Sequence, residues 1–323
     1  MYKVLIPQDV AESGKKYLRD QGYEVVIGTG WDIDTLKREI ADADALLFRT
    51  AKYPAEVLEA AKKLKIASRF GVGYDNIDIE KAAELGIWVA IAQGANAMSV
   101  AEHTIALLLA CSFNIVKSQD EIKKGNWEIR NQLPGIEMNG KTIGILGVGT
   151  IGKLVAEKAR YGLGMKVIGY DVASGTLGYN CPEYIEMKDS MEDVLKESDV
   201  VSVHTPLDKN TRGLIGEKEL SMMKRTAILI NCARGGIIDE SALEKALKEK
   251  QIYAAALDVF TSEPVDLDNG LLKLDNFLAS PHNAALTKEA NEAVSLAAAK
   301  AIDAVLKGGR PAYPVNEPIF KSN

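Results

Sequence analysis

Short runs of aliphatic residues alternate with lysine- and glutamate-rich segments of helical periodicity along most of the chain. This alternation is typical of parallel strands joined by crossover helices, so the sequence predicts an α/β fold. In the first hundred residues, helices are expected over 33–42 and 54–64. The strands expected there, enough for one doubly wound sheet, cover 3–7, 23–28, 45–50, 65–70 and 87–92.

A second series of strand-like runs follows, and its six members suit a dinucleotide-binding sheet. Two separate doubly wound parallel sheets, each with its own core, are therefore expected. The six runs cover 141–147, 166–171, 200–205, 227–233, 253–260 and 277–282.

Two long helices are expected to connect these sheets. The first covers 99–125, where Ser99 and Glu102 have the spacing of a capping box. The second covers 287–309, ends in two glycines and is inferred to return to the first domain. We therefore expect a discontinuous domain of residues 1–98 plus 287–323 and a dinucleotide-binding domain of residues 99–286.

Composition narrows the possible partners and the compartment. The 323 residues are 47% hydrophobic, enough for two ordinary cores, and the net charge of -6 argues against nucleic acid or anionic membrane as a partner. No signal-peptide pattern opens the chain, and the longest apolar run is too short to span a bilayer. Three scattered cysteines suggest neither a zinc site nor a disulfide framework, so we expect a cytoplasmic protein without a metal.

One glycine-rich segment has the full context of a dinucleotide fingerprint. Gly147, Gly149 and Gly152 follow a predicted strand and open a predicted helix, whereas the other GxG pairs of the chain are interpreted as turns. Gly147 would allow the tight turn, Gly149 the close approach of a pyrophosphate, and Gly152 the packing of helix on strand. Asp171 ends the next strand, 171 − 152 = 19 positions after Gly152, and no arginine follows it closely. A carboxylate there binds a ribose diol and repels a 2′-phosphate, which favours NAD over NADP.

Three ionisable residues lie at the ends of three strands in the second series. They are Arg234 in "NCARGG", Glu263 in "LDVFTSEP" and His282 in "ASPHNA". Because ligands of open parallel sheets bind outside the carboxyl ends of the strands, all three could face one crevice. Taken singly, each has a plainer interpretation, as a surface arginine, a turn glutamate and a structural histidine.

The motifs "GILGVGTIG", "NCARGGIID", "ALDVFTSEP" and "SPHNAALT", in this order, resemble those of the D-2-hydroxyacid dehydrogenase family, which includes D-3-phosphoglycerate dehydrogenase. The likeness runs from "RFGVGYDNID" to "PVN". It implies a flavodoxin-like substrate domain, a Rossmann NAD-binding domain and a homodimer built on the nucleotide domain. It also implies that NAD contacts, besides the glycines and Asp171, are Thr150, Ile151, His204, Thr205, Pro206, Cys232, Ala233, Arg234, Asp258 and His282.

The chemistry of a 2-oxo acid suits the three ionisable residues. Reduction needs a hydride on the carbonyl carbon, a proton on its oxygen and a group that holds the carboxylate. Arg234 can fork onto the carboxylate and carbonyl oxygens. His282 would exchange the proton, and Glu263 would orient its imidazole and favour the protonated form. His103 is interpreted as a packing or capping residue of its helix.

The resemblance also places substrate contacts in the first domain, on Arg49, Thr50, Val72, Gly73 and Asn96, with Arg234 from the second. Arg49 and Arg69 are equally compatible with a surface role at strand ends. Arg130 lies near a position from which a phosphate-binding arginine can reach the neighbouring subunit, although the local spacing departs by one residue. The chain ends without a regulatory extension, so serine feedback is not expected.

The leading hypothesis is an NAD-dependent D-2-hydroxyacid dehydrogenase acting on 3-phosphoglycerate. Hydroxypyruvate, glyoxylate, D-lactate or another 2-oxo acid are the alternatives. Formate dehydrogenase is disfavoured because that relative is expected to carry glutamine in place of Glu263. A non-enzymatic NAD(H)-sensing interaction protein is disfavoured because the chain has no long low-complexity flanks.

Overall fold

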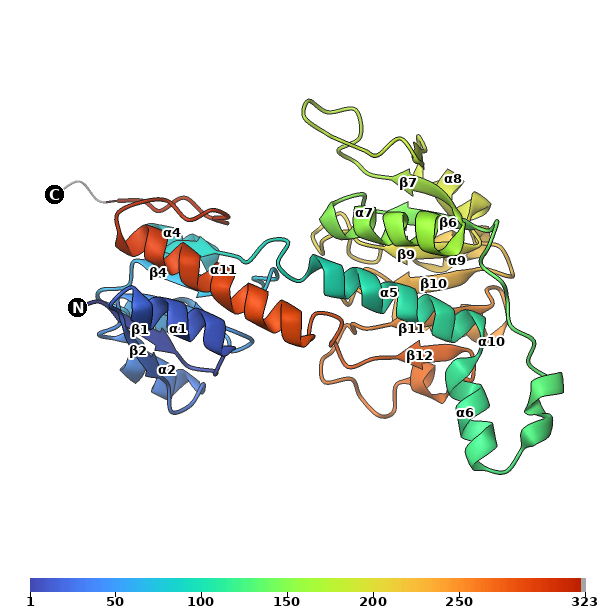
Figure 1. Cartoon of the computed structure of the whole chain (residues 1–323), viewed down its shortest axis with the longest axis horizontal. Coiled ribbons are helices and arrows are strands. Elements are labelled where there is room, and N and C mark those ends of the chain that lie inside the picture. The colour runs from blue at the N-terminus through green and yellow to red at the C-terminus, as the bar shows by residue number, and fades with distance from the viewer. Residues whose placement is uncertain (321–323) are drawn as a thin grey trace. The chain divides into compact units, whose positions relative to one another are not determined.

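The computed structural model describes residues 1–320 and divides the chain into two compact units. The first consists of Met1–Asn96 and Leu286–Asn323, and the second is Ala97–Ala285. Residues 321–323, which the sequence assigns to the first domain, lie outside the described residues. The elements of both units are labelled in Figure 1.

The first unit contains a five-stranded parallel sheet in the order β2-β1-β3-β4-β5, which is a doubly wound order. All five predicted strands are confirmed. They are β1 (Lys3–Ile6), β2 (Glu24–Ile27), β3 (Ala45–Phe48), β4 (Ile66–Arg69) and β5 (Trp88–Ala90). The helices are α1 (Glu12–Asp20), α2 (Ile33–Ile40), α3 (Ala55–Ala60), α4 (Ile79–Glu84) and α11 (Lys288–Leu306).

Both faces of this sheet are buried, because successive side chains of a strand point to opposite sides. Leu46 of β3 belongs to a core shared with Leu36 of α2. Its neighbour Leu47 belongs to a second core shared with Ile302 of α11. Helix α11 also packs along α1, and Figure 1 shows the two side by side in red and blue. The last helix of the chain thus completes the core that the first strands begin.

The second unit contains a seven-stranded parallel sheet in the order β12-β11-β10-β9-β6-β7-β8. The six predicted strands are confirmed, whereas β8, a three-residue edge strand with a central glutamate, was not predicted because it is too short to show a pattern. The strands are β6 (Thr142–Leu146), β7 (Lys166–Tyr170), β8 (Ile185–Met187), β9 (Val200–Val203), β10 (Ile228–Asn231), β11 (Ala254–Leu257) and β12 (Phe277–Ala279).

The helical elements of this unit include one π-helix and two 3₁₀ segments. They are α5 (Ala97–Ser112), α6 (Ile115–Lys123), η1 (Trp127–Asn131), α7 (Thr150–Glu157), the π-helix η2 (Lys158–Gly162), α8 (Met191–Glu197), α9 (Glu217–Met222), α10 (Glu240–Lys248) and η3 (Gly270–Lys273).

The prediction of one long helix over 99–125 is wrong. Helix α5 ends at Ser112, Asn114 adopts φ 52°, and α6 continues at an angle of 58°. The physical reason lies in burial, since α5 packs on the sheet whereas α6 buries none of its residues. Ser99 lies inside the first turn of α5 rather than at its N-cap, so the predicted capping box is also wrong.

Among the described residues, a single helix with the length and apolar character needed to cross a membrane is not found. The bent pair of α5 and α6 meets that criterion only when the two helices are taken together. Most of α5 is buried against the sheet of its own unit.

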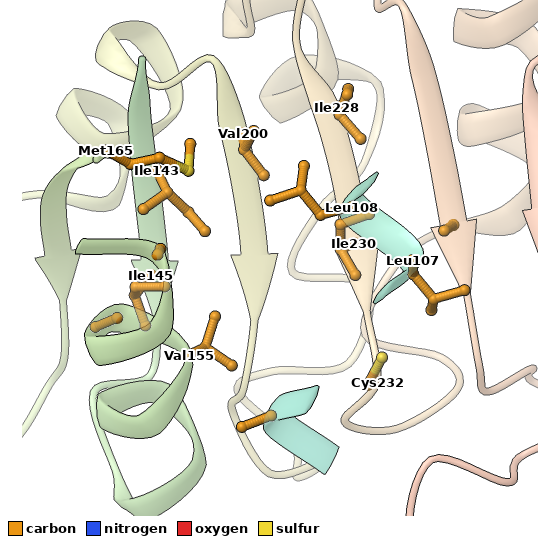
Figure 2. Close-up of a cluster of buried hydrophobic side chains, with 14 of the residues drawn as sticks. Leu107, Leu108, Ile143, Ile145, Val155, Met165, Val200, Ile228, Ile230 and Cys232 are labelled. Atoms are coloured by element: carbon orange, nitrogen blue, oxygen red, sulfur yellow. The ribbon is translucent and has the colours of Figure 1, made fainter. Parts of the chain in front are cut away.

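The core of the second unit holds the strands that carry the candidate site. Side chains from β6, β9 and β10 pack against α5 and α7, and this packing fixes where each strand ends. Cys232 lies at the carboxyl end of β10, directly before the loop of Arg234 (Figure 2). The labelled members of this core in Figure 2 are Leu107, Leu108, Ile143, Ile145, Val155, Met165, Val200, Ile228, Ile230 and Cys232.

Candidate active site

Three glycines after β6 differ in what a side chain would meet at each position. Gly147 adopts φ 92°, and a Cβ there would lie 2.8 Å from the carbonyl carbon of His204. A Cβ on Gly152 would lie 2.2 Å from the carbonyl oxygen of Gly147. Gly149, in contrast, has an ordinary φ of −82° and no atom within 4 Å of its added Cβ. Its missing side chain therefore leaves open space at the start of α7.

The start of α7 suits an anionic group. Gly149 is the N-cap and provides no side-chain cap, so the first amides of the helix are available to an acceptor together with the positive end of the helix dipole. The buried Oγ1 of Thr205, in a residue whose backbone nitrogen borders Gly147, finds no hydrogen-bond partner in the part of the chain that the structure describes. An orphaned hydroxyl beside a glycine loop fits the phosphate of a dinucleotide. Thr150 and Ile151 occupy the first turn, and Pro206 follows Thr205.

His204 is not suited to acid–base work. Its Nε2 lies 2.8 Å from the Oγ of Ser202, and burial lowers the pKa of His204 to about 4. The imidazole is therefore neutral at pH 7, as a group lining a cofactor pocket can be.

Asp171 follows β7 and braces the glycine loop. Its Oδ2 accepts a hydrogen bond from the backbone nitrogen of Val148 at 2.8 Å, and its Oδ1 accepts one from Ala173 at 2.8 Å. Asp171 lies at the end of the second strand of the fingerprint, as its separation from Gly152 along the sequence predicts. The ribose contact stays a prediction, while the bracing of Val148 is a second role that the spacing alone did not reveal.

Glu263 and His282 are in direct contact. The Nδ1 atom of His282 lies 2.6 Å from Oε2 of Glu263, whose Oε1 accepts a hydrogen bond from the backbone nitrogen of Phe260 at 3.0 Å. Because an ionised carboxylate only accepts, the proton of this contact belongs on Nδ1 and Nε2 is left to exchange protons. The His282 side chain is 48% exposed and that of Glu263 37% exposed, so a small molecule can reach the pair.

Asp258 holds the turn that carries His282. Its carbonyl oxygen accepts from the nitrogen of His282 at 2.8 Å, its Oδ1 from Asn283 at 3.0 Å and its Oδ2 from Ala284 at 3.0 Å. The carboxylate is 1% exposed, and His282 adopts an unusual φ of 50°. One buried residue thus fixes three consecutive amides. Sequence reasoning predicted Asp258 as a cofactor contact and did not predict this bracing role.

The loop of Arg234 is ordered by the buried Asn231 at the end of β10. The Asn231 amide donates from Nδ2 to the carbonyl oxygen of Arg234 at 2.9 Å and accepts from the nitrogen of Ala233 at 2.9 Å. Arg234 itself donates from Nη1 to the carbonyl oxygen of Ala233 at 2.8 Å. Asn231 was missed by the sequence argument, and its only signal is an amide at the end of an apolar strand.

Cys232 lies in the same loop and is not a nucleophile candidate. Burial raises the pKa of the Cys232 thiol to about 12, so it stays neutral at physiological pH. The thiol acts as a small apolar side chain at the base of the loop, as the sequence predicts.

Strands β10, β11 and β12 are neighbours in the parallel sheet, so their carboxyl ends lie at one edge. Arg234, Glu263 and His282 all follow these ends. The structure brings Glu263 and His282 into contact and places Arg234 in the loop next to them, where Gly235 borders the backbone of Phe260. The edge therefore presents a cation, a carboxylate and an imidazole.

The candidate substrate residues of the first unit follow the ends of β3, β4 and β5. Arg49 donates to the carbonyl oxygen of Asp9 at 3.0 Å, and its guanidinium carbon lies 5.3 Å from the centre of the Phe70 ring. Arg69 braces the loop of Val72 and Gly73, donating to the carbonyl oxygens of Phe70 and Gly73 at 2.7 Å each. The remaining two candidates are Thr50, whose nitrogen donates to Gln8, and Asn96, whose buried Oδ1 has no partner within residues 1–320.

Residues 105–284 match the family model described as D-isomer specific 2-hydroxyacid dehydrogenase, NAD binding domain. The chain belongs to the D-isomer specific 2-hydroxyacid dehydrogenase family. The resemblance inferred from the motifs is confirmed, and the second unit contains the NAD-binding domain of that family.

Two curated members of this family illustrate the range of activities among its relatives. D-3-phosphoglycerate dehydrogenase of Methanocaldococcus jannaschii is 42% identical over 324 residues, which cover 98% of this chain and 60% of the relative. Glyoxylate reductase of Thermofilum pendens is 39% identical over 327 residues, which cover 99% of this chain and 96% of the relative. The chain thus spans about three-fifths of the length of the first relative and nearly all of the second.

The fold agrees with that of a solved structure over nearly its whole length. The TT0316 protein of Thermus thermophilus superposes with a TM-score of 0.88 at 34% identity, covering 97% of this chain and 99% of that protein. The predicted class of two parallel-sheet α/β domains is confirmed by this match and by the two sheets described above.

Proposed function

We propose that this chain is an NAD-dependent D-2-hydroxyacid dehydrogenase whose leading substrate is D-3-phosphoglycerate. The observation that carries the proposal is the 2.6 Å contact between His282 and Glu263 at the same sheet edge as Arg234, in an NAD-binding domain of this family. An imidazole oriented by a carboxylate is the standard arrangement of a general acid and base.

NAD, when bound, accepts hydride from the hydroxy acid or, in reduced form, supplies it to the oxo acid. Glu263 holds the proton of His282 on Nδ1, so Nε2 removes the hydroxyl proton in oxidation and returns it to the carbonyl oxygen in reduction. Arg234 would fork onto the substrate's carboxylate and carbonyl oxygens, orienting the carbonyl carbon and stabilising charge that develops on its oxygen.

Arg49, Thr50, Val72, Gly73 and Asn96 are proposed as the substrate contacts of the first unit. Two observations support this assignment. Cations at Arg49 and Arg69 flank the loop after β4, as a phosphorylated acid requires, and the orphaned Oδ1 of Asn96 offers a hydrogen-bond acceptor. Glyoxylate and hydroxypyruvate are the second candidates, favoured by the near-complete coverage of a relative named glyoxylate reductase.

The test is a panel of 2-oxo acids assayed with NADH and with NADPH by the loss of cofactor absorbance. We expect turnover with NADH, strongest with phosphohydroxypyruvate, and weaker turnover with NADPH because Asp171 would repel a 2′-phosphate. Turnover of glyoxylate above the phosphorylated acid would select the second candidate. Cofactor binding without turnover of any acid would contradict the proposed activity and favour an NAD(H)-binding interaction protein.

Gly149→Ala is expected to raise the dissociation constant of NAD about tenfold while changing the melting temperature by only a few degrees. The added methyl group meets no protein atom but enters the space that the phosphates would approach. Isothermal titration with NAD and thermal unfolding without it measure the two quantities. Gly162→Ala, which also adds a methyl group in open space, is the control. Equal NAD affinity in both variants would place the phosphates elsewhere.

The assembly proposed is a homodimer built on the second unit. An apolar surface formed by the end of α5, α6 and η1 supports it, since side chains there remain about half exposed or more. Arg130, which is exposed on η1, is proposed to approach a neighbouring subunit's site across this surface. The exposed apolar residues of this surface are Phe113, Ile115, Val116, Ile122 and Trp127.

The double variant Ile122→Asp, Trp127→Asp is expected to sediment as a monomer where the wild-type chain sediments as a dimer, because burying two carboxylates in an interface is costly. Analytical ultracentrifugation measures the mass. The control is Val172→Asp, Leu177→Asp, which changes apolar residues that are even more exposed, in the segment after β7. A wild-type monomer, or a dimer that survives the first double variant, would refute this interface.

The cytoplasm is the proposed compartment. Cys111, Cys181 and Cys232 are all free thiols, which supports a reducing environment.

A further inference from the structure

A polar chain connects α5 to the turn that carries His282. The Nε2 atom of His103, on α5, lies 3.0 Å from the Oγ of Ser280, and Ser280 donates to Oδ1 of Asp258 at 2.6 Å. The same Nε2 atom lies 3.5 Å from Oδ1 of Asp258. Ser280 lies two positions before His282 and at the end of β12. These hydrogen-bonded side chains thus link helix α5, the end of β12 and the buried carboxylate of Asp258 in the loop after β11.

Counting protons assigns the direction of each hydrogen bond. A serine hydroxyl has one proton, and an ionised carboxylate accepts only. Ser280 therefore gives its proton to Asp258 and can only accept from His103, which must carry a proton on Nε2. The side chain of His103 is 25% exposed, so the contact lies partly open to solvent.

We propose that His103 and Ser280 are positioning residues for His282. This inference rests on the proposed role of His282 as the acid and base. His103 fixes the hydroxyl of Ser280 as a donor to Asp258. Asp258 is thereby held where its three acceptor groups capture the amides of residues 282–284. Those bonds maintain the unusual φ of His282 and with it the contact to Glu263.

The proposed positioning role of His103 and a simple packing role predict different behaviour of the His282 imidazole. If His103 only filled space on α5, a ring of equal size would serve as well, and the imidazole of His282 would not respond. If it acts through Ser280 and Asp258, removing its donor must loosen the turn and weaken the preference of His282 for the Nδ1 proton. Glutamine at position 103 retains a donor and phenylalanine retains the ring, so the two variants separate the roles.

The first experiment needs neither cofactor nor turnover. The chain has three histidines, so ¹⁵N-histidine labelling and single variants assign every ring signal by NMR. In the wild type we expect His103 protonated on Nε2 and His282 on Nδ1. In Ser280→Ala and His103→Phe the ring signals of His282 should move toward a mixture of tautomers, whereas His103→Gln should preserve them. A proton on Nδ1 but not Nε2 of wild-type His103, or unchanged His282 signals in both disruptive variants, would overturn the proposal.

The second experiment measures kinetics with the acid that the wild type uses best. Ser280→Ala and His103→Phe should each lower kcat about tenfold and leave the KM for NADH within about twofold, and His103→Gln should restore most of kcat. Equal kcat in all four proteins would overturn the proposal. If the wild type reduces no acid, the proposed function fails while the NMR result still decides the positioning role. Near-UV circular dichroism checks folding, and Ser280→Ala decides alone if His103→Phe does not fold.

Discussion

His282→Gln is expected to lower kcat for the preferred 2-oxo acid about a thousandfold while changing the dissociation constant of NAD only severalfold. Glutamine occupies a similar volume and can bond to Glu263, but it cannot take up or release a proton in the physiological range. Steady-state kinetics at saturating NADH measure the first quantity and titration with NAD measures the second. The size of the effect follows from the geometry, because Nε2 of His282 is the one nitrogen that the Glu263 contact leaves for proton exchange.

Glu263→Gln is the matched comparison for this prediction. It keeps a side chain of the same length that can accept from His282, and it removes the negative charge that stabilises the imidazolium. We expect a smaller loss, about tenfold to a hundredfold, because the imidazole keeps a hydrogen-bond partner but loses its charged one. If His282→Gln retained a tenth or more of the wild-type kcat, His282 would not be the proton donor.

The elements of the fold that the sequence predicted are those governed by local pattern. The strands that the sequence predicted in both sheets are three to five residues long and mostly apolar, and their runs are visible without tertiary information. The break between α5 and α6, in contrast, cannot be predicted from the local sequence pattern. The helical pattern continues through Asn114, and only the loss of contact with the sheet explains why the helix turns there.

The candidate site also contains residues that the sequence reveals and residues that it does not. The chemical types of Arg234, Glu263 and His282 and their positions after three strands can be inferred from the sequence, because neighbouring parallel strands end at one edge. The residues that hold them cannot. Asn231 and Asp258 act by bonding to backbone groups whose positions depend on the conformations of their loops. A sequence shows which side chains are present and not which amides they will meet.

Gly235→Ala is expected to lower kcat/KM at least a hundredfold and the free energy of unfolding by about 3 kcal/mol. The added Cβ would lie 1.9 Å from the carbonyl oxygen of Phe260 and 2.7 Å from the nitrogen of Thr261. Both are backbone atoms and cannot move like the end of a flexible side chain. The loop of Arg234 must therefore separate from the loop that carries Glu263, and the Phe260 amide that bonds to Glu263 moves with it. Denaturant unfolding and steady-state kinetics measure the two losses.

Gly162→Ala separates this steric effect from the general effect of replacing glycine. It adds the same methyl group in the same unit where no atom lies within 4 Å, so stability and kcat/KM should remain close to those of the wild type. A second comparison, Arg234→Lys, should lower kcat/KM about as much as Gly235→Ala without the loss of stability, because lysine keeps the charge and loses the forked geometry. If Gly235→Ala were as stable and as active as Gly162→Ala, close apposition of the β10 and β11 loops would not be required for function. The arrangement of the guanidinium beside the imidazole and its carboxylate would then need another cause.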